Sequence, residues 1–356
     1  MRTCLAILAS VGMTSAYAQE VLDFDEVPRE FREDIFDLTP WDPEYEPPRT
    51  EDGRPSFEGT WTNASITTLH RPEGIDKLVL TPEEAFAYMQ KRTSTFREDE
   101  MPSDLDEGVL EAGDTSIEGA GGYNKFWIDI GSTLAVVDGE IRSSWLVRPE
   151  SGQPQPKRTA YGSLLARRDA YQASENPEDR SVGDRCLAGF GGTGGPPMLN
   201  VLYNNTYEIA QTDDVLAVVV EMVHQPRVIR IGGTHRSNEM KPWLGDSIAR
   251  WEGDTLVVHT TNHRPERYRR TDGLFIAEDS EVEERFTRVA DDTIFYEFTV
   301  TDPEIYDVPH RGEMVFRKSD APQYEYACHE GNYALPGILA GARREERLAA
   351  EDAAAN

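Results

Sequence analysis

The sequence predicts a mainly β protein, an antiparallel β-barrel or sandwich with a few peripheral helices and a long N-terminal arm. From about residue 207 to 316 the chain consists almost wholly of short segments rich in β-branched and aromatic residues, separated by Asp, Gly and Asn turns. No helical pattern lies between these segments, as a parallel α/β sheet would require. No repeat of fixed period and no shift in composition divides the chain, so we expect one domain over residues 57–335.

The N-terminus has the pattern of a secretory signal peptide. One positive charge at Arg2 precedes an apolar stretch, and Ala16-Tyr17-Ala18 supplies an A-x-A cleavage pattern. We expect residues 1–18 to be removed and the protein to be periplasmic or secreted. Cys4 lies inside this leader, too early to carry a lipid anchor. No later stretch has the roughly 18 consecutive apolar residues that a membrane helix needs.

Residues 19–56 are acidic, rich in proline and without a sustained apolar period. Such composition is typical of extended chain, because proline and repelling carboxylates disfavour regular structure. We expect this segment to be an arm that lies over the domain.

Few helices are predicted. Thr81-Pro82-Glu83-Glu84 combines a threonine cap, proline at the first helical position and a glutamate placed for a capping box, so a helix begins there and ends near Lys91. A second helical pattern covers 158–173. A C-terminal helix with a tail covers 336–356. The acidic, glycine-rich residues 98–122 predict a surface loop.

The strands are predicted from alternation and turn residues. Three lie before residue 150, with a tight turn at Asp138-Gly139. Residues 189–197, rich in glycine but without the Lys and Ser or Thr of a phosphate loop, are interpreted as a flexible turn. The predicted strands are 126–130, 134–137, 141–147, 207–210, 215–223, 227–231, 247–251, 255–260, 282–289, 293–301 and 313–316.

Two cysteines remain after the leader, Cys186 and Cys328. An oxidising compartment favours a disulfide between such a pair. The alternative is two unrelated buried thiols.

The chain has 65 acidic and 36 basic residues, with a net charge of -29. Nucleic acid as a partner is excluded because phosphate binding depends on clustered Lys and Arg. The same surplus disfavours a polyanionic substrate and favours a neutral or cationic ligand, although a saline habitat would also explain it.

Histidines gather in the second half of the chain, which invites a test for metal. His259 and His263 are four residues apart, about 13 Å along a strand, so they do not share an ion unless the chain turns between them. His224 and His235 flank the Gly232-Gly233 turn, a better geometry, but no HExxH or cysteine-rich signature accompanies them. We predict no metal and no cofactor.

The same region predicts a small-molecule pocket, in which aromatic walls surround a few polar groups. Histidine beside a carboxylate is the usual apparatus of acid–base chemistry. Each of these side chains can equally cap a strand or fill the core. The predicted acid–base residues are His224, His235, Asp246 and His329, and the predicted ligand-binding residues are Arg227, Trp243, Trp251, Asn332 and Tyr333.

Two short blocks resemble those of GDSL-type esterases. They are Gly245-Asp246-Ser247-Ile248 and Asp307-Val308-Pro309-His310. The resemblance implies Ser247 as nucleophile and His310 as its base. In that family the serine block opens a helix of a parallel α/β fold, whereas here it leads into a predicted strand. The alternative is a turn in which the Asp side chain bonds to backbone.

A longer resemblance runs from Trp243 to Val258, with the pattern W-x-G-D-S-x-x-R-W-E-G-D-T-L-V-V. Together with the segments at 178–180, 196–198, 283–288 and 325–333, it is similar to an uncharacterised family of secreted bacterial hypothetical proteins. This resemblance implies an exported, β-rich protein and assigns no catalytic residue.

The leading hypothesis is a periplasmic protein that binds a partly apolar small molecule and acts as a lyase, isomerase or hydrolase through His and Asp acid–base chemistry. The alternatives are a non-catalytic carrier, an envelope interaction module and the serine esterase. The sequence leaves the oligomeric state open.

Overall fold

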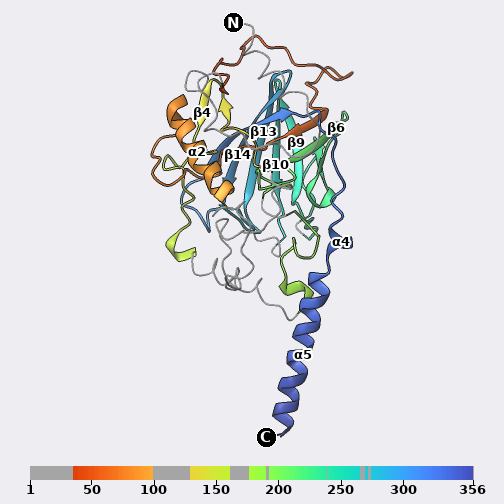
Figure 1. Ribbon diagram of the computed structural model, residues 1–356. Coiled ribbons are helices and arrows are strands. Elements are labelled where there is room, and N and C mark those ends of the chain that lie inside the picture. The colour runs from red at the N-terminus through yellow and green to blue at the C-terminus, as the bar shows by residue number, and fades with distance from the viewer. Residues whose placement is uncertain are drawn as a thin grey trace.

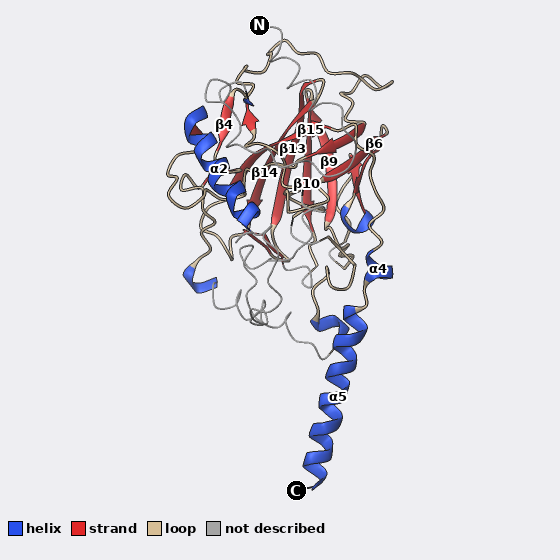
Figure 2. Cartoon of the chain, viewed as in Figure 1, coloured by secondary structure: helices blue, strands red, loops and turns tan. Residues whose placement is uncertain are grey.

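The computed structural model describes residues 35–98, 129–160, 176–189, 192–237, 239–264, 269–271 and 274–355. The predicted signal peptide lies outside these ranges, as do residues 99–122 of the predicted loop and most of the predicted helix at 158–173. The described part is a mainly β structure with peripheral helices, which confirms the predicted fold class (Figures 1 and 2).

Nine strands close into a barrel, joined in the order β1-β6-β7-β8-β9-β10-β13-β14-β15, and β1 pairs with β15 to complete the ring. Within the described sheet every neighbouring pair is antiparallel except β8 with β9, which is parallel. The strands are β1 (Gly59–Thr62), β6 (Thr206–Gln211), β7 (Val215–Val220), β8 (Gln225–Ile231), β9 (Asp246–Glu252), β10 (Thr255–Thr261), β13 (Glu281–Ala290), β14 (Thr293–Thr301) and β15 (His310–Lys318), and β5 (Leu146–Arg148) adds a short strand beside β15.

A small sheet of β2 (Val79–Leu80), β4 (Glu140–Arg142) and β3 (Val136–Val137) packs with helix α2 (Pro82–Glu98) around its own apolar cluster. The predicted capping box is present: the Thr81 N–H donates to Glu84 Oε2 at 2.9 Å and the Glu84 N–H to Thr81 Oγ1 at 3.4 Å. The helix continues past the predicted end at Lys91 to Glu98.

Strand prediction was least accurate before residue 150. Residues 126–128 of the predicted strand 126–130 lie outside the described ranges, and 129–130 form no strand. The predicted strand 134–137 contributes only β3, and 141–147 is divided between β4 and β5. The division arises because the chain changes partners. Ser143 bonds to the backbone of Lys77 and Leu78, whereas the Trp145 N–H bonds to the Thr68 carbonyl. A further pair, β11 (Arg269–Thr271) with β12 (Leu274–Ile276), was not predicted.

The described part of the arm, residues 35–56, lies against the barrel as expected. The ring of Trp41 is 4.9 Å from that of Phe295, and the Tyr45 hydroxyl donates to Asp291 at 3.0 Å. Arg49 binds both carboxylate oxygens of Asp254. These apolar and polar contacts are among those that hold the arm over the barrel.

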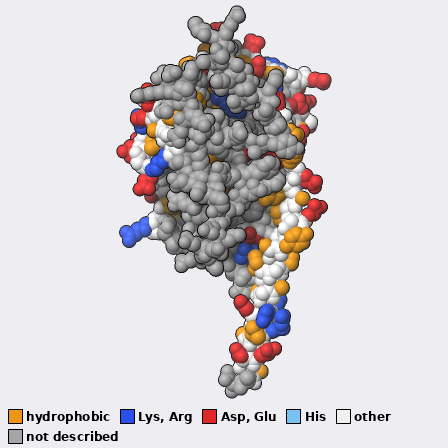
Figure 3. All heavy atoms as spheres, viewed as in Figure 1, with side chains coloured by type: hydrophobic (Ala, Val, Ile, Leu, Met, Phe, Trp, Pro, Cys, Tyr) orange, Lys and Arg blue, Asp and Glu red, His pale blue; other side chains and the backbone are white. Residues whose placement is uncertain are grey.

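The C-terminal segment consists of α4 (Cys328–Gly331) and α5 (Ala334–Ala355), which extends away from the barrel (Figures 1 and 3). The predicted disulfide joins Cys186 to Cys328 and so ties α4 to the middle of the chain. Two short 3-10 helices are η5 (Pro177–Asp179) and η6 (Met222–His224). None of the helices in the described ranges is long and apolar enough to cross a membrane.

Side chains fill the interior of the barrel. Large aromatic residues lie inside it and contact one another, as Tyr296 and Phe316 do at a ring distance of 5.3 Å. Gly312 leaves room for the Phe298 ring, since a Cβ there would lie 2.2 Å from that ring. The lumen is therefore a packed core, and a ligand has to bind elsewhere.

One polar layer crosses this core. Arg227 and Glu284, with 1% and 0% of their side chains exposed, form a bidentate ion pair. Nη2 of Arg227 also donates to Ser247 Oγ and Thr260 Oγ1, each at 3.3 Å, and the Tyr296 hydroxyl donates to Glu284 Oε1 at 2.7 Å. Burial, together with the neighbouring Glu284, raises the pKa of Tyr296 well above its ordinary value. The layer joins five consecutive strands, β8, β9, β10, β13 and β14.

We predict that Glu284→Gln lowers the free energy of unfolding by about 3–5 kcal/mol, because it leaves the Arg227 cation buried without a counter-charge. Urea denaturation checks this. The control is Arg285→Gln, one residue along β13, where the partly exposed side chain pairs with Glu252, and the expected loss is below about 1 kcal/mol. Equal losses in the two variants would contradict this account.

Candidate functional site

A gap in the barrel wall creates the site. The parallel register of β8 and β9 pairs Ile229 with Ser247 and Ile231 with Ala249, and β9 begins at Asp246. The first half of β8 therefore has no β9 residue beside it. The crossover 232–245, required because parallel strands cannot be joined by a hairpin, returns past this gap.

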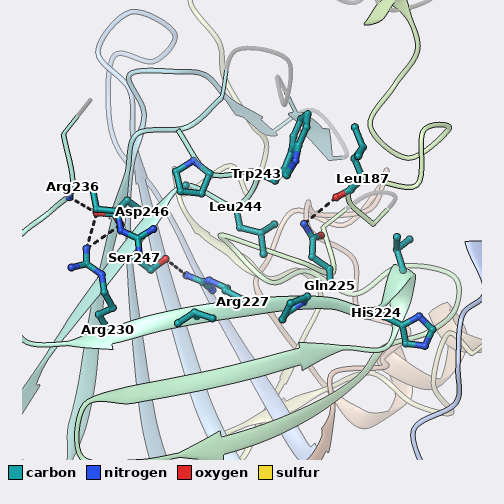
Figure 4. A pocket seen from close by; sticks show the side chains of 15 residues that line it. Leu187, His224, Gln225, Arg227, Arg230, Arg236, Trp243, Leu244, Asp246 and Ser247 are labelled. Carbon is teal, nitrogen blue, oxygen red and sulfur yellow. Dashed lines mark hydrogen bonds and ion pairs between the residues drawn. The ribbon is translucent and has the colours of Figure 1, made fainter. Parts of the chain in front are cut away.

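The crossover meets β9 at Gly245, a position where a side chain would be strained. Gly245 has φ +73°, and a Cβ there would lie 2.8 Å from Thr260 Cγ2 and 2.9 Å from the Thr261 carbonyl oxygen. This close approach brings Trp243 and Leu244 over β8 (Figure 4).

A cavity of about 500 Å³ lies between the crossover and β8. In Figure 4 its charged residues Arg230, Arg236 and Asp246 group at one end, and His224 lies at the other. The remaining wall combines leucine, valine, proline and tryptophan side chains with the polar Gln225, Arg227 and Ser247. The lining comprises Leu187, Val223, His224, Gln225, Pro226, Arg227, Val228, Arg230, Arg236, Pro242, Trp243, Leu244, Gly245, Asp246 and Ser247.

Backbone strain is concentrated beside the cavity. Val223 and His224 both have positive φ, +63° and +45°. Left-handed backbone is costly for a β-branched residue such as valine, at roughly 1–3 kcal/mol, and such strain gathers at functional sites. Gln225 braces this turn, since its amide donates to the Leu187 carbonyl at 3.4 Å and its Oε1 accepts from the Gly189 N–H at 3.3 Å.

Asp246 is the centre of the polar end. Its carboxylate, 3% exposed, accepts from the Arg230 guanidinium at 3.0 Å, from His235 Nδ1 at 3.0 Å and from the Arg236 N–H at 2.9 Å. Burial alone raises the pKa of Asp246, but the hydrogen bonds from Arg236, His235 and Arg230 together outweigh it and hold that pKa below its ordinary value. The group is therefore an anchor for its neighbours and a poor base.

His235 links Asp246 to the more exposed residues His259 and Glu281. Its Nε2 lies 2.8 Å from Nδ1 of His259, and Nε2 of His259 lies 3.7 Å from Oε2 of Glu281, which is 61% exposed. With Asp246 as acceptor, the Nδ1 of a neutral His235 carries the proton. Its Nε2 then accepts from the Nδ1–H of His259, which leaves His259 Nε2 as a basic nitrogen facing Glu281. Asp246, His235, His259 and Glu281 form a carboxylate–imidazole–imidazole–carboxylate row.

Two arginines lie near the ring of Trp243. The guanidinium of Arg264 lies 4.2 Å from its ring centre and that of Arg185 lies 6.0 Å away. Both distances are within the range of cation–π attraction. Trp243 lines the cavity, and its predicted role in ligand binding stays a prediction.

The structure brings together some of the predicted residues and separates others. His224, Arg227, Trp243 and Asp246 line the cavity, and His235 contacts Asp246. The other four are not on its wall. Trp251 stacks on Phe57, His329 is exposed on α4, Asn332 bonds to the Asp184 carbonyl, and Tyr333 is 84% exposed.

The two residues of the esterase hypothesis do not meet. Ser247 is buried in the polar layer, bonded to Arg227 and Thr260. His310 is fully buried on β15, where its Nε2 accepts from the Gln155 N–H at 3.1 Å. Three strands separate β9 from β15 in the sheet. The Asp of the GDS block bonds to backbone, as the alternative interpretation predicts, although the bonded residue is Arg236 in the crossover.

Among the described residues, no group of three or more His, Cys, Asp or Glu side chains has a geometry that could hold a metal ion. Both ring nitrogens of His235 are already hydrogen-bonded, Nδ1 to Asp246 and Nε2 to His259.

Sequence reasoning missed several residues of the site. His259 was considered only as a metal ligand, and Arg230, Arg236 and Glu281 were not considered. Strand alternation could have indicated His259 and Arg230 as outward-facing neighbours of Asp246. Their meeting with His235 depends on the crossover path, which no local pattern encodes.

The glycine-rich turn was wrongly interpreted as flexible. Residues 192–199 are buried, and the Met198 N–H donates to the Tyr296 hydroxyl inside the barrel at 2.9 Å. Glycine is needed for contact rather than for motion. A Cβ on Gly195 would lie 2.6 Å from Met198 Cγ and 3.2 Å from Arg227 Nη1.

Comparison with protein-family models and with curated proteins found no match to this sequence. The resemblance to secreted bacterial proteins stays a prediction, and the function has to be argued from the site.

We predict that Asp246→Asn lowers the free energy of unfolding at pH 7 by about 1.5–3 kcal/mol, because it removes charged hydrogen bonds at a buried position. The folded-state pKa of Asp246 is depressed, so its contribution is present above the unfolded-state value near 4 and is lost as pH falls below it. The difference between variant and wild type in urea unfolding should therefore shrink between pH 5 and pH 3. A difference independent of pH would contradict the assignment.

Proposed function

We propose that this protein, exported as its N-terminus predicts, binds a partly apolar small molecule in the cavity beside β8. The observation that carries the proposal is the cavity of about 500 Å³, whose lining combines apolar side chains, among them Trp243, Leu244 and Val228, with the charged group around Asp246. Ligand sites commonly have this size and this mixture of apolar surface and a few fixed polar groups. The Cys186–Cys328 bridge supports export, because disulfides persist in oxidising compartments.

The construction of the wall supports binding in preference to a packing defect. Val228, on the outer face of β8, is 55% exposed although it lies in the cavity wall. An exposed apolar side chain beside Trp243 and Leu244 offers apolar area that a ligand would remove from water. The strained turn at Val223 and His224 lies at the same place, which is unexpected for a surface without a role.

We predict that the neutral dye N-phenyl-1-naphthylamine binds the protein with increased fluorescence, and that Val228→Asp weakens this binding at least fivefold. The reason is that a carboxylate in the apolar wall has to be desolvated when the dye binds. Trp243→Ala should also weaken the binding of the dye.

The matched control is Val308→Asp, because Val308 is equally a surface valine, 50% exposed, and is not part of the cavity wall. Equal dye binding by the two aspartate variants would remove the cavity as the binding site. Circular dichroism should show that both variants are folded.

A second candidate function is acid–base catalysis, favoured by the row from Asp246 to Glu281. A buried carboxylate that orients one imidazole is the arrangement by which proteins set the tautomer of a catalytic histidine. In this row the basic nitrogen that remains is Nε2 of His259, which is partly exposed. His235 would act as a positioning residue and Asp246 as its anchor.

We predict for this second function that the protein accelerates elimination of 5-nitrobenzisoxazole, a reaction that needs only a positioned base, by about 10²-fold or more over free imidazole. His259→Gln should abolish the acceleration, whereas His329→Gln, an exposed histidine outside the row, should leave it unchanged. A rate no greater than that of imidazole would leave binding without catalysis as the function.

A further inference from the structure

The charges of the cavity wall are opposite in sign to those of the whole chain. Against a net charge of -29, the wall holds the guanidinium groups of Arg227, Arg230 and Arg236 and the single carboxylate of Asp246. Distant surface charges are screened over about 8–10 Å at ordinary salt, so the groups on the wall decide which ligand charge is favoured.

The three arginines of the wall differ in how far a carboxylate neutralises their charge. Arg227 is paired with Glu284 inside the barrel. Arg230 and Arg236 share one carboxylate, because Asp246 lies 3.0 Å from the first and 3.8 Å from Nε of the second. Two guanidinium groups with one carboxylate leave an excess of one positive charge at the polar end.

We infer that the ligand of this cavity is a small monoanion, an aryl or alkyl carboxylate in type, whose charged group lies at the Arg230 and Arg236 end and whose apolar body lies against Trp243 and Val228. The inference rests on the proposed binding function. It replaces the neutral or cationic ligand expected from composition, because the net charge of a chain says nothing about the few groups that contact a ligand. Asp246 disfavours a ligand with more than one negative charge.

The test uses three probes with one ring system: 2-naphthoate, 2-naphthalenemethanol and 2-naphthylmethylammonium. Isothermal titration calorimetry at pH 7 and low salt should give an affinity for naphthoate at least tenfold above that for the ammonium probe, with the alcohol between them. Added salt should weaken the binding of naphthoate and leave the binding of the alcohol unchanged.

Arg236→Gln should lower the affinity for naphthoate about tenfold and leave the affinity for the alcohol unchanged. The reason is that only the anionic probe forms a charged hydrogen bond or ion pair with Arg236. Its control is Arg250→Gln, on the outer face of β9, whose exposed side chain pairs with Glu252 and is not part of the wall. That variant should bind all three probes as the wild type does.

The outcomes separate the two proposals. If all three probes bind with equal affinity and Trp243→Ala weakens each of them, the cavity binds small molecules and the anionic preference is wrong. Tighter binding of the ammonium probe, or naphthoate binding unchanged in Arg236→Gln, also overturns the preference. If no probe binds at millimolar concentration, the proposed function fails together with it.

Discussion

The rest of the barrel depends on one buried ion pair, Arg227 with Glu284. Neither group can leave the interior without exposing the other as an unpaired charge in a medium of low polarity, so β8 and β13 must both turn these faces inward. A slip of one residue in either strand would move the whole apolar set to the outside. Because Ser247, Thr260 and Tyr296 bond to the same pair, the register of five neighbouring strands is fixed together.

This filled interior determines where binding is feasible. A barrel that held its ligand in the lumen would need small inward side chains, whereas here Phe and Tyr rings occupy the centre. The room for a ligand lies in the wall, where a parallel pair of strands leaves half of β8 uncovered and the crossover passes over the gap. The cavity thus has one wall anchored to the polar layer through Arg227 and another formed by a long connection.

The sequence predicted the fold class and the disulfide because both depend on simple patterns: alternation, turn residues, and two cysteines that remain after a predicted leader. It also placed Asp246 and Trp243 in one site, since they are close in the chain. What it could not supply was geometry between segments. The pairing of His235 with His259, and the separation of Ser247 from His310, follow from strand order and from the path of residues 232–245, which no single segment encodes. Composition could not indicate the charges of the cavity wall, because net charge describes the whole chain, whereas three arginines and one aspartate line the cavity.

Closure of the barrel also constrains when the protein can fold. The ring is completed by pairs such as Trp61 with Lys318, so β1 can complete its pairing only after β15 has been synthesised. During synthesis from the N-terminus, β1 remains without one of its neighbours until almost the whole chain has been made, and the barrel cannot close strand by strand as it emerges. Pairing between segments so far apart in sequence makes folding slow and leaves strand edges exposed meanwhile. Because the chain is strongly acidic, its copies repel one another, and this repulsion disfavours aggregation before the barrel has closed.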